Sequence, residues 1–206
     1  MLKKAVVIKP RSVKPFNWDY KTIVAFTLFL CGVIIGAFVI KNSSQELKDL
    51  ICSWLSNYIS AKEQGSFIIC FSGTVLPLLV FVFVVFLFGL CATGVPLVLL
   101  VPFLYGGLCG AYLSAMLLCF GLKGLLYCVL VDFLCYAITA ATLFKCCCLS
   151  FNMAIDLFGC IVGNFKKICP FNTYAIDYIV LCIPVLIAGL IHTICFTIFA
   201  ELFFFI

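Results

Sequence analysis

Two ionisable residues, Asp132 and His192, stand inside long apolar stretches of this 206-residue sequence. Ionisable groups are costly within a membrane and often mark a path for ions or solutes. The pair has two interpretations. In the first, the carboxylate and the imidazole form a structural hydrogen bond. In the second, they contact a solute or a proton in a permease. Because two groups make only a short relay, the structural interpretation is favoured.

Other reactive chemistry has little support in the sequence. His192 is the only histidine, so no histidine cluster can bind zinc and no serine or cysteine nucleophile has a choice of base. The 15 cysteines contain no C-x-x-C pair, and cysteine often serves as a small apolar residue. The run Cys146-Cys147-Cys148 offers acylation or metal binding as alternatives, without the paired spacing of a metal site. Hydrolase, nucleotide and dinucleotide motifs are missing. We expect no enzymatic activity and no cofactor.

Composition determines the class of protein. Hydrophobic residues make up 66% of the chain and charged residues 10%, with a mean hydropathy of +1.32. A soluble domain has about a quarter of its residues charged. Soluble globular, disordered and disulfide-scaffold proteins are therefore excluded, and most of the chain is expected to lie in lipid.

The charged residues and one turn divide the chain into five predicted spans. A helix of about 20 residues crosses the roughly 30 Å of membrane hydrocarbon. Gly94 and Pro96 break the long uncharged stretch, because Gly tolerates a sharp turn and Pro suits a helix start. The sequence predicts an all-α polytopic membrane helix bundle formed by residues 22–206. Its predicted spans are 22–40, 68–92, 96–120, 124–144 and 177–201.

The segment between the first two spans predicts an amphipathic helix over residues 44–60. Ser43 and Glu46 have capping-box spacing. The helix either lies flat on the lipid surface or also docks a partner protein, and the two interpretations are compatible. A second short apolar segment, 151–163, predicts an interfacial helix on the cytoplasmic side. The apolar stripe of the amphipathic helix has helical spacing and comprises Leu47, Leu50, Ile51, Trp54, Leu55, Tyr58 and Ile59.

The distribution of basic residues predicts the orientation. The tail of residues 1–21 is basic, which places the N-terminus in the cytoplasm and, with five spans, the C-terminus outside the cell. Attraction to anionic lipid headgroups accounts for the basic tail. We therefore predict a multi-pass protein of a bacterial cell membrane with lipid as a partner and without nucleic acid. The basic residues of the tail are Lys3, Lys4, Lys9, Arg11, Lys14 and Lys21.

Small residues at four-residue spacing predict close helix packing. Gly32 and Gly36 form one such stripe, and Gly106, Gly110 and Ser114 form another. Such stripes allow helix backbones to approach closely within lipid. They serve either the packing of this bundle or pairing with the anchor of another protein, and the sequence does not separate the two.

Several stretches resemble the stage II sporulation protein M family. They are the first span around Leu30-Cys31-Gly32-Val33-Ile34-Ile35-Gly36-Ala37, the signature Gly94-Val95-Pro96-Leu97-Val98-Leu99-Leu100 running into Phe103-Leu104-Tyr105-Gly106-Gly107-Leu108-Cys109-Gly110, and Gly121-Leu122-Lys123-Gly124-Leu125-Leu126-Tyr127. The resemblance extends from about Asp19 to the C-terminus. The chain departs from the family at Val131-Asp132-Phe133, where a polar element with Pro or Asn is expected, and in its many cysteines.

The resemblance implies a five-helix integral membrane protein without enzymatic activity. Members of the family act in forespore engulfment, where they anchor a peptidoglycan-degrading complex with stage II sporulation proteins P and D. The function expected from the sequence is therefore a membrane scaffold. The alternative is a small-solute or proton-coupled permease that uses Asp132 and His192.

Overall fold

The structure is a computed structural model that describes residues 20–162 and 170–199. Most of the predicted basic tail (1–19) and the end of the last predicted span (200–201) lie outside the described residues. Within the described ranges all regular structure is helical. The elements are α1 (Tyr20–Lys41), α2 (Gln45–Gln64), α3 (Phe67–Gly89), α4 (Val95–Tyr127), the π-helix η1 (Cys128–Asp132), α5 (Phe133–Ile161) and α6 (Phe171–Phe199).

Four helical segments of the described chain are long and apolar enough to cross a membrane: α1, α3, the continuous run Val95–Ile161, and α6. The chain is therefore a multi-pass membrane protein, and the predicted all-α membrane bundle is confirmed. Large apolar side chains cover its outside, as expected of helices that have lipid as their solvent. Among the most exposed are Ile34, Ile68, Leu122 and Ile179.

The run Val95–Ile161 folds back on itself at Gly121, whose φ of 59° and ψ of −139° interrupt the helix. Only glycine adopts this backbone conformation without strain. The two arms then run antiparallel, because Tyr112 contacts Asp132 and, further from the turn, Val98 contacts Cys147. This hairpin supplies the two predicted spans 96–120 and 124–144.

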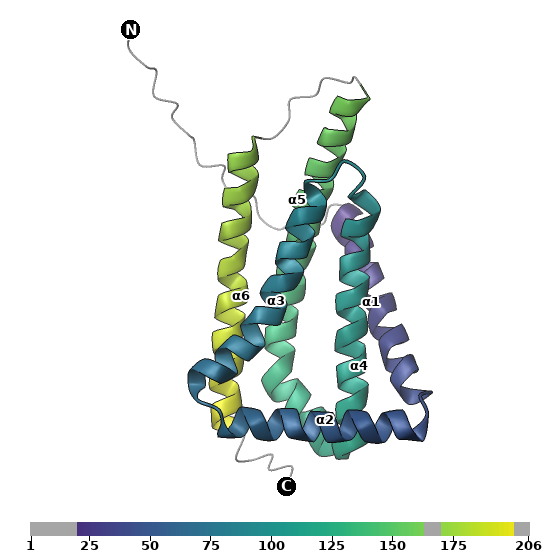
Figure 1. The fold of residues 1–206 in the computed structure, drawn as a ribbon, viewed down its shortest axis with the longest axis vertical. Coiled ribbons are helices and arrows are strands. Elements are labelled where there is room, and N and C mark those ends of the chain that lie inside the picture. Colours follow the sequence, from purple (N-terminus) through teal and green to yellow (C-terminus); the bar gives the residue numbers. More distant parts are fainter. Residues whose placement is uncertain (1–19, 163–169, 200–206) are drawn as a thin grey trace.

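The short helix α2 lies across one end of the bundle (Figure 1). The same end of the bundle holds the turn between α4 and α5, the start of α3 and the end of α6, whereas α1 begins at the opposite end. The helix begins one residue later than its predicted cap implies. Ser44 accepts a hydrogen bond from the amide of Leu47, whereas Ser43 donates to the carbonyl of Ile40 and extends the end of α1.

The predicted interfacial helix over residues 151–163 is wrong as a separate element. Helix α5 continues without a break to Ile161. Ser150, Met153 and Ala154 are buried, and the ammonium of Lys21 donates to the side-chain carbonyl of Asn152. The segment is therefore the end of a long packed helix, because its apolar face contacts the bundle.

Candidate functional site

Asp132 and His192 meet in the interior of the bundle. The Nε2 atom of His192 lies 2.8 Å from Oδ1 of Asp132, and the two residues are only 4% and 2% exposed. The hydroxyl of Tyr112 donates to Oδ2 of the same carboxylate at 3.1 Å, and Oγ1 of Thr74 lies 3.4 Å from Nδ1 of the imidazole. The structure thus brings together the two residues that the sequence predicts to pair and adds a neighbour to each.

The four residues of this buried polar chain come from four different elements. Thr74 belongs to α3, Tyr112 to α4, Asp132 to the end of η1 and His192 to α6. A π-helix widens the turn of a helix locally, and such segments are frequent at functional sites. The chain of contacts therefore ties both arms of the hairpin to α3 and α6.

The hydrogen-bond donors among these four polar residues can be counted. The single proton of the Thr74 hydroxyl is donated to the carbonyl of Cys70 at 3.0 Å, so the Thr74 contact to His192 requires a proton on Nδ1. The contact between Nε2 and Asp132 requires a second proton between those two atoms. An imidazolium with a carboxylate and a neutral imidazole with a protonated carboxyl group both satisfy every contact. Either arrangement holds helices together and also forms a continuous set of groups for proton movement.

The apolar stripe of α2 divides into two edges that have different surroundings. Leu55 is 1% exposed and packs, together with Ile59, against the buried cluster around Met116 and Val131. Ile51 is half-buried beside the same cluster. Ile51 and Leu55, which the sequence predicts at an interface with lipid or a partner, thus contact the end of the bundle, which is itself apolar. The exposed edge consists of Leu47, Leu50, Trp54 and Tyr58.

The exposed edge carries a stacked aromatic pair. The rings of Trp54 and Tyr58 lie 5.5 Å apart at an interplanar angle of 10°. The ammonium of Lys62 lies 5.5 Å from the ring of Tyr58 and 5.1 Å from the ring of Phe196 on α6. Burial lowers the pKa of Lys62 and raises the pKa of the Tyr58 hydroxyl. The ammonium at this end of α2 is thus held against α6.

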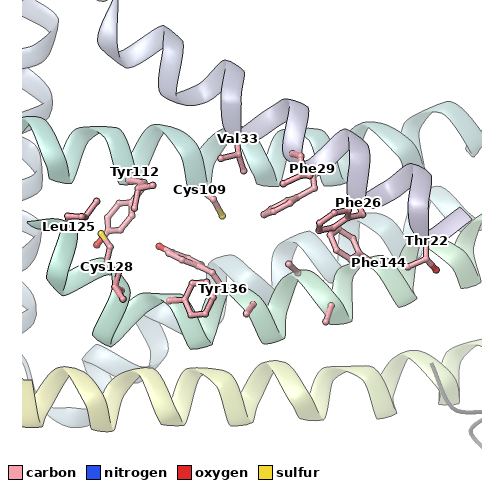
Figure 2. A pocket seen from close by; sticks show the side chains of 17 residues that line it. Thr22, Phe26, Phe29, Val33, Cys109, Tyr112, Leu125, Cys128, Tyr136 and Phe144 are labelled. Carbon is pink, nitrogen blue, oxygen red and sulfur yellow. The ribbon is translucent and has the colours of Figure 1, made fainter. Parts of the chain in front are cut away.

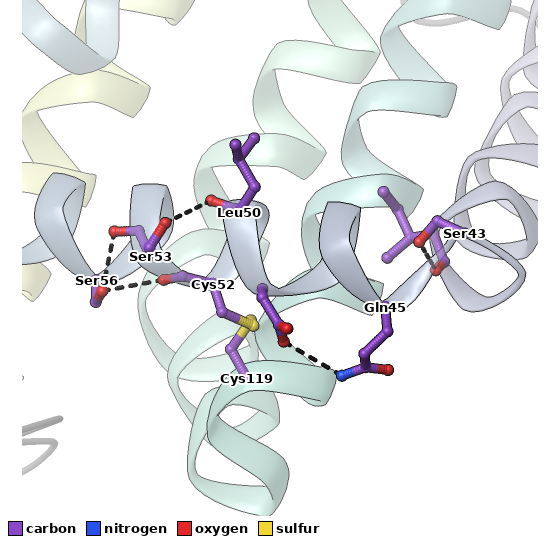
Figure 3. The surroundings of a disulfide bond; sticks show 9 residues. Ser43, Gln45, Leu50, Cys52, Ser53, Ser56 and Cys119 are labelled. Carbon is purple, nitrogen blue, oxygen red and sulfur yellow. Dashed lines mark hydrogen bonds between the residues drawn. A yellow bond between two sulfur atoms is a disulfide. The ribbon is translucent and has the colours of Figure 1, made fainter.

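A disulfide bond joins α2 to the hairpin. It links Cys52 with Cys119, 67 positions later, across a Cα–Cα distance of 5.5 Å (Figure 3). Sequence reasoning missed it, because 15 similar cysteines give no indication of pairing. The sequence did indicate that the two cysteines could meet, because both fall on the predicted outer side of the membrane. The figure also shows Leu50 and Gln45 on opposite sides of α2, as expected of an amphipathic helix at a lipid surface.

The glycine stripes are used within the bundle. A Cβ atom added to Gly32 or Gly36 of α1 would lie 2.2 or 2.0 Å from carbonyl oxygens of α4, and one added to Gly106 or Gly110 would lie 2.2 or 2.1 Å from carbonyl oxygens of α1. The hydroxyl of Ser114 donates to the carbonyl of Ala37 at 3.4 Å. These faces are therefore occupied by internal packing and are not free for another protein's anchor.

The cysteine run on α5 is also packed. Cys146 and Cys147 are buried, and the thiol of Cys147 donates to the carbonyl of Val98 at 3.7 Å. Cys148 is half-buried and lies 3.4 Å from the hydroxyl of Thr22. In the described part of the chain, no group of three or more His, Cys, Asp or Glu side chains is arranged to hold a metal ion.

Comparisons with known proteins do not identify the chain. No protein-family model, no curated protein sequence and no solved structure matches it. The resemblance to the stage II sporulation protein M family therefore stays a prediction from the residues that carry it.

Proposed function

We propose that this protein is a non-enzymatic membrane scaffold and that α2 forms its docking surface. The observation that carries the proposal is the way α2 is fixed. The Cys52–Cys119 disulfide and the buried Leu55 hold the helix against the bundle, while Trp54 and Tyr58 stay exposed as a stacked pair. Rigid aromatic residues are typical anchors of protein interfaces, because little conformational freedom is lost when they bind.

The disulfide supports the orientation predicted from charge. Disulfides form and persist in oxidising compartments, outside the cytoplasm. The end of the bundle that holds α2 and the end of α6 is therefore assigned to the extracytoplasmic side. Helix α1 begins at the opposite end (Figure 1), next to the basic tail in the sequence. The N-terminus is then cytoplasmic and the C-terminus extracytoplasmic, in a bacterial cell membrane.

The proposed partners are other membrane-anchored proteins. By resemblance to the stage II sporulation protein M family, these are stage II sporulation proteins P and D, and the scaffold would localise peptidoglycan hydrolysis during engulfment. Lipid is the second partner, because Leu47 and Leu50 extend the apolar edge along the same helix. The hydrolytic chemistry belongs to the partners, so the scaffold itself needs no catalytic residue.

Affinity purification from membranes tests the scaffold. Trp54→Ala removes the centre of the exposed edge, and Ser53→Ala is the matched control because Ser53 is exposed on the same turn. The scaffold predicts that the partners recovered with the wild type and with Ser53→Ala are lost with Trp54→Ala. Equal recovery from all three proteins would contradict the assignment of the docking surface.

The buried polar chain supports a second candidate function, a proton-coupled permease. The chain Thr74–His192–Asp132–Tyr112 joins four elements through consecutive contacts, which is longer than the two-residue relay expected from the sequence. Uptake or conductance in vesicles tests it. The permease predicts a flux that collapses with Asp132→Asn and persists with Asp49→Asn on exposed α2. The scaffold predicts no flux in either protein.

A further inference from the structure

An elongated apolar groove of about 650 Å³ lies between α1, the first arm of the hairpin and α5 (Figure 2). Phe26, Phe29 and Val33 of α1 lie along the groove, with Cys109 of the adjoining α4 beside them and Tyr136 of α5 on the facing side. Phe144 of α5 packs against the rings of Phe26 and Phe29 at one end of the groove, and beyond it α5 contributes small side chains that leave the hollow open. They are Ala137, Ala140 and Ala141.

The groove has the shape and the surroundings of a site for a hydrocarbon chain. Along α1 the groove extends from Thr22 to Val33, a rise of about 16 Å. Along α5 and η1, which face α1, it extends from Phe144 back to Cys128, a rise of about 24 Å. Its volume falls within the range of about 300–1,000 Å³ typical of ligand pockets. Every helix that lines it belongs to a membrane-spanning segment, and its lining residues Leu30, Val129 and Phe133 are exposed on the outside of the bundle, where lipid tails lie.

Positive charge marks the end of the groove where α1 begins. Lys21 precedes the lining residue Thr22, and its ammonium donates to Asn152 and lies 4.9 Å from the ring of Phe151. The exposed Lys145 stands one helical turn beyond the lining residue Ala141, on the same face of α5. Asp156 lies one helical turn further along α5 than Asn152. Lys21 and Lys145 are therefore closer to this end of the groove than the carboxylate of Asp156 is.

We propose that this groove binds one acyl chain of an anionic phospholipid, with the phosphate of the headgroup at Lys21. The chain fills the hollow between the phenylalanines of α1 and the alanines of α5. A basic residue near an anionic lipid surface contributes about 1 kcal/mol, or about a fivefold preference over a zwitterionic headgroup. The acyl chain then packs between α1 and α5, where the side chains of the protein leave space.

Filling the groove tests the acyl-chain site. Purified protein is delipidated, exposed to phosphatidylglycerol and analysed by native mass spectrometry. Ala141→Trp fills the hollow, and Ile183→Trp, on the exposed face of α6, is the matched control. The proposal predicts that wild type and Ile183→Trp retain a bound lipid and that Ala141→Trp loses it. Equal retention by all three proteins would overturn the proposal.

The headgroup assignment has its own variants. Lys21→Gln is compared with Lys41→Gln at the other end of α1, using phosphatidylglycerol against phosphatidylcholine. Lys21→Gln is expected to lose about fivefold of the preference for phosphatidylglycerol, as estimated for one charge, and Lys41→Gln is expected to keep it. Unchanged preference in Lys21→Gln would overturn the headgroup site.

A third measurement needs no substitution. Wild-type protein is photolabelled by a phospholipid with a diazirine in its acyl chain. Peptides of α1, α4 and α5 that line the groove are expected to carry the label in excess over the exposed face of α6. Even labelling of all lipid-facing helices would overturn the site, whatever the variants show.

Discussion

The imidazole of His192 and the carboxylate of Asp132, 60 positions apart in the sequence, lie 2.8 Å from each other inside the bundle. The contact joins α6 to the second arm of the hairpin, and Tyr112 extends it to the first arm at 3.1 Å. In lipid, where helix association gains little from the hydrophobic effect, such contacts and close backbone packing hold helices together. The contact is therefore a structural element whichever function the bundle has.

Removing the carboxylate is expected to destabilise the bundle. Asp132→Ala leaves the buried groups of His192 and Tyr112 without their acceptor, and each interhelical hydrogen bond of this kind is worth about 0.6–2 kcal/mol in membrane proteins. Asp132→Asn keeps an acceptor of similar shape and is expected to lose less. Unfolding by detergent titration measures both, with exposed Asp49→Ala as the control. Equal stability of Asp132→Ala and Asp49→Ala would contradict the structural role.

Two neighbouring glycines at the interface between α1 and α4 differ in the space available for a Cβ atom. A Cβ atom on Gly106 would lie 2.2 Å from the carbonyl oxygen of Phe29, whereas a Cβ atom on Gly107 has only the carbonyl oxygen of Gly32 nearby, at 3.8 Å. Gly106→Ala is therefore expected to destabilise the protein by about 1–3 kcal/mol, as overpacking does in other cores. Gly107→Ala should be close to neutral. A similar loss in both variants, measured by unfolding, would show that α1 and α4 pack differently.

Breaking the disulfide is expected to loosen α2 selectively. With Cys52→Ser the helix keeps the packing of Leu55 and Ile59 but loses its covalent link to Cys119. Hydrogen exchange should then become faster over residues 45–64 and stay unchanged over α6. Cys91→Ser, which replaces an exposed free cysteine, is the control. Unchanged protection of α2 would mean that the apolar contacts alone fix the helix.

Lys62 is expected to make stability depend on alkaline pH. Burial lowers its pKa in the folded protein below the ordinary value of 10.5. Between the two values the unfolded chain binds a proton that the folded chain lacks, so stability rises as pH increases through this window. The unfolding midpoint of wild type should rise more steeply between these pH values than that of Lys62→Gln. Parallel curves for the two proteins would contradict the burial of the ammonium.

Much of the fold follows from where charges and turn residues interrupt the apolar sequence. The predicted spans 22–40 and 68–92 correspond to α1 and α3 within a few residues, because uninterrupted apolar length determines a membrane helix. The break between α3 and α4 lies at Gly94, shortly before a Pro that suits a helix start. The chain reverses direction at Gly121, a residue type that permits a positive φ. Prediction was accurate where a local property of the sequence determines the structure.

The parts that were not predicted depend on contacts between distant segments. Residues Leu55 and Leu50 have the same character in the sequence, but only Leu55 is covered by the end of the bundle. The partners Tyr112 and Thr74 of the buried pair follow from the register of α4 and α3 against η1 and α6, which no local pattern records. The same holds for the pairing of Cys52 with Cys119 and for the continuation of α5 past Ser150.

The most direct test of the scaffold is photocrosslinking from α2 in intact cells. A photoreactive amino acid at Trp54 stands on the exposed edge, and one at Ile34, 69% exposed on the lipid-facing side of α1, is the control. The scaffold predicts a discrete protein adduct from position 54, on the extracytoplasmic side, and only lipid adducts from position 34. Lipid adducts alone from position 54 would contradict it.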